Sequence, residues 1–381
     1  MATQKAPNRV YYIAGGYEQS RPILTGSAAK KTFNTIPIVD VSNVFSSSLE
    51  ERQAVAKEVG RAAEEVGFFY AVNPPVSKAK MDKAFEAIKK FFDQSDEEKL
   101  KYHVDKSPAV KGFHPFDKEK VDAARRESFG FGNDYTEPEQ HVTKVAPLGT
   151  VHLNQWPDET IPELRKVMYE YYREVYDFGK KMIQIFALAL GLEENELDNL
   201  FKYPLTDVTV QHYPAQAEPT AAKEILYAHA DYGALTFLLQ NDPSDKVPGL
   251  EVLNANGVWV PCPPMDHAYV INTGNYLEVL SNSRFPSTVH RVFSDSSVPR
   301  FSLPFFLSPD PSAVIVPHPR LVPAGEKPRY EPHDVGARHV KGMMYARPEH
   351  PYVKKLAALG LAEKDYRYEL LSQPMLAGLA E

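Results

Sequence analysis

Cysteine is almost missing from this chain of 381 residues, in which Cys262 is the single example. One thiol excludes an internal disulfide, and its position between two prolines favours a packed side chain over a nucleophile. The first residues lack the apolar run of a signal peptide, and no segment is as long and apolar as a membrane-spanning helix. These absences predict a cytoplasmic protein with no membrane partner.

Clusters of basic residues are missing as well. Lysine and arginine number 43 against 50 aspartates and glutamates, so the net charge is −7 at pH 7 and no nucleic-acid partner is expected. The composition is that of a globular protein, with 43% hydrophobic and 24% charged residues, which excludes a disordered or fibrous chain. The length allows one large domain or two.

The spacing of hydrophobic residues divides the chain into four parts. Residues 1–35 show no clear period and predict an extended N-terminal arm, and residues 36–200 predict an α/β region. Residues 201–320 alternate with a period of two, and residues 321–381 predict a C-terminal helical cover. Helices are predicted over 49–66, 78–92, 95–100, 161–190, 336–346 and 352–371, with early strands over 36–40 and 68–72 and with loop and short strand over 102–157.

The period-two region contains short strands with turn-rich pieces between them. Strands are predicted over 206–213, 224–230, 234–240, 250–254, 258–261, 268–272, 287–293, 300–307 and 313–317. About eight such strands are typical of a double-stranded β-helix, the cupin-like jelly roll. We therefore predict a mainly β fold with flanking helices, in which the long helix over 161–190 supports the barrel. The interior of such a barrel can hold a metal and a small ligand.

Two histidines and one carboxylate stand out in this region. His229 and Asp231 are two residues apart, which on a strand places both side chains on one face. His290 lies in another short β-branched run and can supply a third ligand. Together they leave one face of an octahedron free, which is the arrangement of non-haem Fe(II) oxygenases. The same residue types also suit zinc, so a zinc hydrolase is an alternative.

A candidate anion site follows His290. Arg300 and Ser302 again share one face of a predicted strand. A planar guanidinium beside a hydroxyl can hold a carboxylate through parallel hydrogen bonds. Zinc hydrolysis would leave this pair without a role, so the pair favours an oxygenase.

These motifs carry a resemblance to a known family. The chain resembles the isopenicillin-N-synthase-like group of Fe(II)/2-oxoglutarate-dependent dioxygenases, from about residue 36 to residue 310. The matching N-terminal segments are Ile36–Asp40, Gly67–Phe69, Phe91–Phe92, Glu97–Lys99 and Asn154–Pro157. The matching segments of the period-two region are His229–Gly233, Gly249–Val252, Ser287–Val292 and Arg300–Ser302.

The resemblance implies the fold and the metal centre. It implies a distorted jelly roll over 201–320 as the Fe(II)/2-oxoglutarate catalytic core. It also implies that His229, Asp231 and His290 are the iron ligands. No catalytic side chain beyond the metal centre is implied.

The resemblance further implies the cosubstrates. Arg300 and Ser302 would bind the distal carboxylate of 2-oxoglutarate, and Tyr213 would add a hydrogen bond. 2-Oxoglutarate would become succinate and CO2 while O2 oxidises a small organic metabolite by hydroxylation, desaturation or ring formation, with ascorbate as a candidate stimulant. We expect an enzyme of secondary metabolism, either a monomer or a weak homo-oligomer, that binds a small-molecule substrate.

Two alternatives share the fold, and three residues depart from the family pattern. One alternative is an iron oxidase in which Arg300 and Ser302 hold the substrate's own carboxylate instead of 2-oxoglutarate, and the other is a non-catalytic jelly-roll binding protein. Asn73 precedes two prolines where relatives carry His-Gly, Thr209 stands where many have arginine, and Asn275 stands where aspartate is common. The last two are expected near the pocket and indicate a changed substrate.

Overall fold

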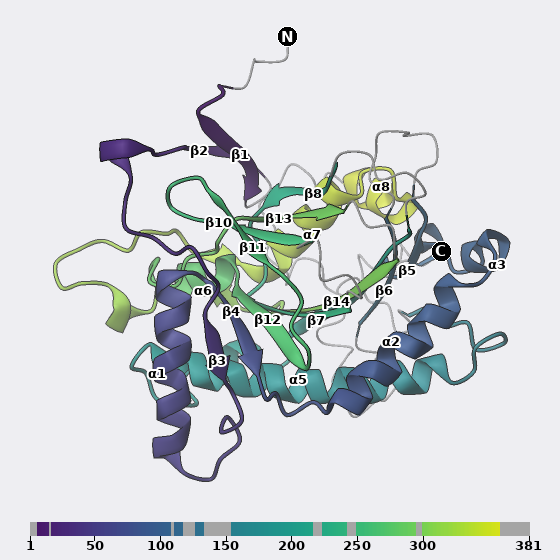
Figure 1. Ribbon diagram of the computed structural model, residues 1–381, viewed down its shortest axis with the longest axis horizontal. Helices are drawn as coiled ribbons and strands as arrows, with labels where there is room; N and C mark the ends of the chain where they lie inside the picture. Colours follow the sequence, from purple (N-terminus) through teal and green to yellow (C-terminus); the bar gives the residue numbers. More distant parts are fainter. Residues whose placement is uncertain are drawn as a thin grey trace.

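Two β-sheets that face each other form the centre of the protein. The computed structural model describes residues 6–14, 17–107, 110–116, 126–132, 154–215, 223–241, 249–294 and 299–358. In Figure 1 the strands β8, β10 and β13 of the smaller sheet lie above β7, β12 and β14 of the larger sheet, with helix α5 beneath. The mainly β architecture with flanking helices is therefore confirmed.

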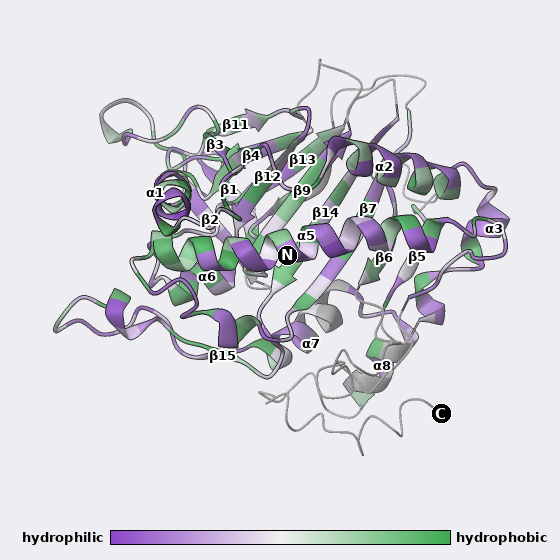
Figure 2. Ribbon diagram, turned by 90° about the horizontal axis from the view of Figure 1, so that it is seen from below, coloured by the Kyte–Doolittle hydropathy of each residue, from purple (hydrophilic) through white to green (hydrophobic). Residues whose placement is uncertain are grey.

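The larger sheet is packed against one long helix. Its strands follow in the order β3 (Ile38–Asp40), β4 (Phe68–Val72), β12 (Ala268–Thr273), β9 (Leu235–Asn241), β14 (Arg300–Ser308), β7 (Leu205–Tyr213), β6 (Glu127–Gly132) and β5 (Gly112–His114). Helix α5 (Leu164–Ala189) crosses the outer face of this sheet (Figure 2). The apolar stripe of α5 is buried, including Tyr171, Phe178 and Phe186, because side chains spaced by three and four residues share one face of a helix.

The smaller sheet contains the N-terminal arm. Its order is β11 (Trp259–Cys262), β10 (Leu250–Leu253), β13 (His290–Ser294), β8 (Lys223–His229), β1 (Arg9–Ala14) and β2 (Tyr17–Pro22). Ile13 on β1 pairs in parallel with His229, and the Ala230 N–H donates to the Ile13 carbonyl at 2.9 Å. Strands β1 and β2 of the arm thus form an antiparallel pair that extends the sheet. Its strands showed no clear period because an edge hairpin buries little of either face.

Serine residues begin the helices of the α/β region. Helix α1 (Leu49–Glu65) follows Ser48, α2 (Lys78–Phe92) follows Ser77, and α3 (Asp96–Leu100) follows Ser95. Each serine hydroxyl accepts a hydrogen bond from the backbone N–H three residues later, which satisfies one of the free donors at a helix start. These helices begin and end within about two residues of their predicted positions.

Gly67 connects α1 to the sheet and to the metal-binding region. Its φ of 75° lies in the left-handed region, which a residue with a side chain adopts only with strain. A Cβ atom there would lie 2.5 Å from the Thr288 hydroxyl and 2.7 Å from the Pro286 carbonyl oxygen. The glycine therefore allows β4 to lie against the segment before β13, where the Phe68 ring packs 5.1 Å from the His290 ring.

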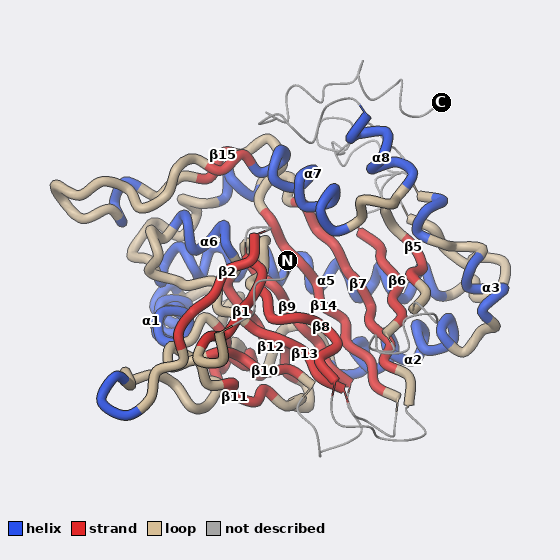
Figure 3. The backbone as a smooth tube through the Cα atoms, turned by 90° about the horizontal axis from the view of Figure 1, so that it is seen from above, coloured by secondary structure: helices blue, strands red, loops and turns tan. Residues whose placement is uncertain are grey.

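The C-terminal helices lie at one end of the larger sheet. Figure 3 shows α7 (Val335–Ala346) and α8 (Pro351–Ala358) near the ends of β5, β6 and β7. His350, just before α8, contacts the Val104 carbonyl at 3.1 Å. Of the helix predicted over 352–371, residues 359–371 lie outside the described part. None of the described helices is long and apolar enough to cross a membrane.

Several elements differ from their predicted bounds. Strand β13 begins at His290 instead of residue 287, and β15 (Val314–Ile315), which pairs with β16 (His333–Asp334), is shorter than predicted. Helix α6 (Asn275–Leu280) was not predicted. Strands β5 and β6 lie in the stretch over 102–157 for which loop and short strand were predicted, and all six residues of β6 are buried.

Candidate metal centre and its cavity

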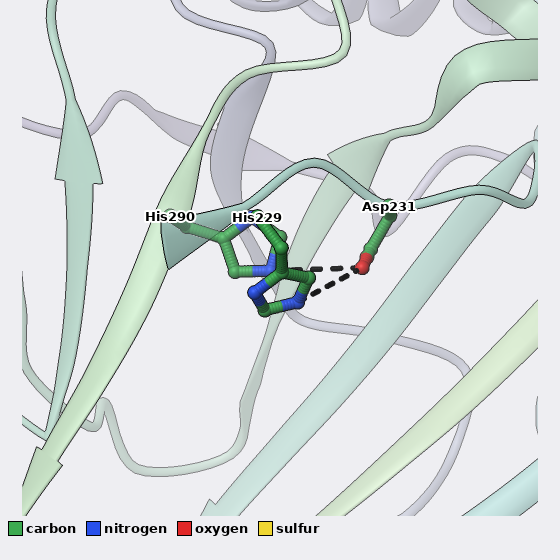
Figure 4. Close-up of side chains that lie close together, drawn as sticks. All are labelled: His229, Asp231 and His290. Atoms are coloured by element: carbon green, nitrogen blue, oxygen red, sulfur yellow. Dashed lines mark ion pairs between the residues drawn. The ribbon is translucent and has the colours of Figure 1, made fainter. Parts of the chain in front are cut away.

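Two paired strands bring the histidines together. His229 ends β8, His290 begins β13, and the two residues are direct partners in the antiparallel pairing. Directly opposed residues project from the same face of a sheet. Their imidazole rings therefore lie side by side, with centroids 4.2 Å apart (Figure 4).

The carboxylate of Asp231 faces both rings. Its Oδ1 lies 3.5 Å from His229 Nε2 and 3.6 Å from His290 Nε2. All three ligand atoms lie within 4.8 Å of one another. Ligand atoms bound at about 2.0–2.2 Å to one ion are at most about 4.4 Å apart, so the two measured separations fit one shared metal ion.

Backbone carbonyls orient both imidazoles. His229 Nδ1 lies 2.8 Å from the Tyr227 carbonyl oxygen, and His290 Nδ1 lies 3.2 Å from that of Thr288. A carbonyl only accepts, so each Nδ1 carries the proton and donates. Each Nε2 is then left with a lone pair directed at the centre, as a metal ligand requires.

Hydrogen bonds orient the Asp231 side chain, whereas the sequence predicted that a strand face shared with His229 would orient it. It lies beyond the end of β8, so its orientation does not come from a shared strand face. Thr236 Oγ1 and Asn272 Nδ2 both donate to Asp231 Oδ2, at 2.5 and 2.8 Å. The Asn275 N–H and the Ser287 hydroxyl donate to its backbone carbonyl, at 2.9 and 3.1 Å. These bonds occupy Oδ2 and leave Oδ1 to face the histidines.

The protonation states suit a divalent metal. Burial by itself raises the pKa of the Asp231 carboxyl, but His290, His229 and the Thr236 hydroxyl outweigh it and hold that pKa below its usual range. Burial and the neighbouring His229 lower the pKa of His290 to about 4, against the opposing effect of Asp231. Near neutral pH the centre presents an ionised carboxylate and a neutral imidazole, the forms that bind metals.

Replacing Thr236 by valine should weaken metal binding, because one of the two donors that fix the Asp231 carboxylate is lost. Loss of such a supporting group typically costs about 10- to 100-fold in metal affinity. Calorimetric titration of the metal-free protein with Mn(II) measures the change, and the exposed Thr160 gives the control variant Thr160→Val. Equal Mn(II) affinity in wild type and Thr236→Val would show that Thr236 does not position the carboxylate.

The three residues line a cavity between the two sheets. Its volume is about 90 Å³, well above the roughly 10–15 Å³ that one water needs. Along β14 every second residue faces it, namely Arg300, Ser302, Pro304 and Phe306, and along β9 Thr236, Leu238 and Gln240 do the same. The alternation predicted for these strands therefore also identifies the cavity wall.

The candidate anion site lies in the same cavity. Arg300 pairs with Tyr213 across β14 and β7, and its guanidinium carbon lies 3.9 Å from the centre of the Tyr213 ring. Arg300, Ser302 and Tyr213 are all buried. The structure thus brings together the three residues that the resemblance implied.

Arg300 has much unused hydrogen-bonding capacity. Its guanidinium donates to the Phe293 carbonyl at 3.2 Å, and no described carboxylate pairs with it. A guanidinium has five N–H donors, and a buried one without an anion is costly. This orphaned cation fits the distal carboxylate of 2-oxoglutarate.

Because Gly249 has no side chain, the Arg300 guanidinium can lie directly against its backbone. A Cβ atom at this position would lie 2.5–2.6 Å from three atoms of the Arg300 guanidinium. Gly249→Ala should therefore displace Arg300 and weaken 2-oxoglutarate binding at least about tenfold, since hydrogen bonds to charged groups contribute about 1.5–3 kcal/mol. Titration of the metal-loaded protein with 2-oxoglutarate tests this, with Gly342→Ala as control because a Cβ there meets nothing within 4 Å. Unchanged 2-oxoglutarate affinity would contradict the role of Gly249.

Two of the three family departures, Asn73 and Asn275, have local explanations. Asn73 adopts a left-handed φ of 55°, which asparagine tolerates, and donates to Asp40 Oδ2 at 3.0 Å. Asn275 starts α6 and supports Asp231 through its backbone N–H. Neither Thr209 nor Asn275 is among the described residues that line the cavity, but the hydrogen bond from Asn275 to the Asp231 carbonyl places Asn275 beside it.

Two facing sheets that enclose two histidines, one carboxylate and a buried arginine without a described carboxylate partner are typical of non-haem iron oxygenases. Comparison with known proteins agrees. Residues 36–159 match the model of the N-terminal domain of the non-haem dioxygenases in morphine synthesis, and residues 205–309 match that of the 2OG-Fe(II) oxygenase superfamily. The chain is 30% identical over 340 residues to the 2-oxoglutarate-Fe(II) type oxidoreductase hxnY of Emericella nidulans, covering 86% of this chain and 95% of that protein.

The chain belongs to the Fe(II)/2-oxoglutarate-dependent dioxygenase family, as the resemblance implied. A solved protein of Caulobacter crescentus assigned to the 2OG-Fe(II) oxygenase family aligns with a TM-score of 0.71 at 28% identity, covering 82% of this chain and all of that one. A Neurospora crassa protein solved in complex with alpha-KG and thymine has a TM-score of 0.67 at 24% identity, covering 85% of this chain and 97% of that one. These neighbours confirm the jelly-roll fold, and the family establishes an enzyme that uses Fe(II), 2-oxoglutarate and O2.

Proposed function

We propose that His229, Asp231 and His290 hold the Fe(II) of this dioxygenase. The support is their geometry, since three ligand atoms converge from a strand end, a strand start and the turn after β8. Bound Fe(II), together with 2-oxoglutarate and O2, supplies the oxidising power that breaks a C–H bond of the substrate. The three side chains would hold the metal, as in the two-histidine, one-carboxylate sites of non-haem Fe(II) oxygenases.

We further propose that Arg300, Ser302 and Tyr213 hold the distal carboxylate of 2-oxoglutarate. The single observation that carries this proposal is the buried Arg300 guanidinium, which pairs with no described carboxylate. Its planar fork can bind both oxygens of a carboxylate, and the Ser302 hydroxyl from the same strand face can add a third bond. The Arg300 guanidinium lies over the face of the Tyr213 ring, and this cation–π contact stabilises the charge.

The primary substrate that we propose is a small organic metabolite, which is hydroxylated, desaturated or cyclised. The support is the apolar wall that Leu238, Val292 and Phe306 give to the cavity. We also propose a cytoplasmic enzyme of secondary metabolism, a monomer or weak homo-oligomer without a nucleic-acid partner. The four-part division of the chain at residues 35, 200 and 320 remains our proposed domain organisation.

The decisive experiment measures stoichiometry. The Fe(II)-loaded enzyme with 2-oxoglutarate and ascorbate is screened against small metabolites, and O2 uptake, succinate and oxidised product are quantified together. We expect one succinate for each product formed, only in the presence of Fe(II). Product and O2 uptake without succinate would favour the iron oxidase in which Arg300 and Ser302 hold the substrate, and hydrolysis with zinc and without O2 would favour a zinc hydrolase.

A further inference from the structure

A second arginine enters the same cavity. Arg126 lies directly before β6, whose first residue Glu127 pairs with His212 on β7. Because β6 and β7 are antiparallel, the residue before Glu127 lies opposite the residue after His212, so Arg126 lies beside Tyr213. On the other side of β7, Tyr213 pairs with Arg300 of β14. Arg126 lines the cavity together with the three candidate iron ligands. The two arginines thus flank Tyr213 within one cavity.

The charged surroundings of Arg126 do not neutralise it. No described residue forms a hydrogen bond or ion pair with Arg126, and its side chain is half-buried. The nearby groups on β5 and after α7 are His114 and Arg347, which contact each other at 2.9 Å. Burial and then Arg347, with a smaller effect of Arg126, lower the pKa of His114 to about 2, as expected where positive charge is in excess.

The closest acids in this region have other partners. Asp207 on β7 pairs with Lys111 at 2.7 Å, and Asp105 lies 3.7 Å from His103. Both carboxylates act on Arg347 from a distance, and neither contacts Arg126. Among the described residues, no carboxylate therefore pairs with Arg126.

The cavity wall also holds polar atoms without partners. Gln211 Oε1 and Gln240 Nε2 are buried, and no described residue hydrogen-bonds to either atom. Gln211 and Gln240 stand opposite Ser302 on the two strands that flank β14, so all three project from the same face of the sheet. Buried donors and acceptors without partners are costly, so this wall is suited to a polar ligand.

We propose that Arg126 binds a carboxylate of the primary substrate, so that this enzyme oxidises small organic acids in preference to neutral metabolites. The proposal rests on the proposed function, in which Arg300 is occupied by 2-oxoglutarate. A planar guanidinium matches a carboxylate through two parallel hydrogen bonds, and a partly desolvated cation discriminates strongly by charge. Arg126 is then a specificity-determining residue separate from the cosubstrate site.

The test compares acids with their own neutral amides. Mn(II)-loaded enzyme saturated with 2-oxoglutarate is titrated calorimetrically with benzoate, phenylacetate and hexanoate, and with benzamide, phenylacetamide and hexanamide. At least one acid should bind the wild type about tenfold or more tightly than its amide. Arg126→Gln should weaken acid binding about ten- to a hundredfold and remove the preference, because a hydrogen-bonded charge is lost.

Two further variants complete the test. Arg126→Lys keeps the charge without the fork and should retain part of the preference. Arg165→Gln makes the same change as Arg126→Gln at a surface arginine that pairs with Asp158, and should leave all affinities unchanged. Thermal melting checks that each variant folds.

Three results would overturn the inference. They are the absence of any acid preference in the wild type, a preference that survives Arg126→Gln, and a loss of 2-oxoglutarate affinity in that variant in place of acid affinity. The last result would assign Arg126 to the cosubstrate site. Failure of the wild-type, metal-loaded enzyme to bind 2-oxoglutarate at all would instead overturn the proposed function, which keeps the two failures distinguishable.

Discussion

Asp231→Ala should lose Fe(II) binding and 2-oxoglutarate turnover together while the fold survives. Asp231 is the anionic member of the candidate ligand set, and both histidines lie within 3.6 Å of its Oδ1. Removing it deletes the carboxylate ligand and leaves the Thr236 and Asn272 donors without their acceptor. Because changes in supporting groups alone cost about 10- to 100-fold in affinity, we expect a loss of more than about a hundredfold for the ligand itself.

The cost in stability should be much smaller. Each buried donor left without an acceptor costs about 1–3 kcal/mol of folding stability. The substitution also removes the desolvation penalty of a buried carboxylate, which offsets part of that cost. Iron content after anaerobic reconstitution, 2-oxoglutarate consumption and thermal melting measure the three effects. Asp158→Ala, at an exposed position, is the control. Full iron content and full turnover in Asp231→Ala would remove this residue from the metal centre.

Arg300→Lys should raise the apparent KM for 2-oxoglutarate strongly and that for the primary substrate much less. An ammonium cannot reproduce the two parallel hydrogen bonds of a guanidinium, and it cannot lie flat over the Tyr213 ring in the same way. Truncating one partner of a buried charged pair costs about 2–5 kcal/mol, and lysine should lose part of that range. We therefore expect an increase of about ten- to a hundredfold, at about 1.4 kcal/mol for each factor of ten.

Ser302→Ala should have a smaller effect on the same constant, because a single neutral hydrogen bond contributes about 1 kcal/mol. Arg291→Lys is the matched control for Arg300→Lys, since Arg291 forms its ion pair with Glu251 at 2.8 Å. Steady-state kinetics with both substrates varied separates the two KM values. If Arg300→Lys changed only the constant for the primary substrate, the arginine would hold that substrate, and the 2-oxoglutarate-independent oxidase would replace the present proposal.

Local patterns in the sequence were sufficient for the residue types of the site and for the class of fold. Alternation with a period of two predicted the strands that carry His229, His290 and Arg300, because a half-buried strand must alternate polar and apolar residues. The same reasoning, continued past Ser302, would have predicted Pro304 and Phe306 in the cavity wall. A helical stripe likewise predicted α5 and its buried face.

The tertiary structure decided what depends on contacts between distant segments. Asp231 faces the histidines because Thr236 and Asn272 hold its second oxygen, and no strand face is involved. The N-terminal hairpin joins the smaller sheet because Ile13 pairs with His229, a residue more than 200 positions away. Arg126 belongs to no motif, and the register of β6 against β7 alone brings it into the cavity. Periodicity reports how each segment divides its own side chains between core and solvent, whereas register and buried hydrogen bonds are set by partners far along the chain.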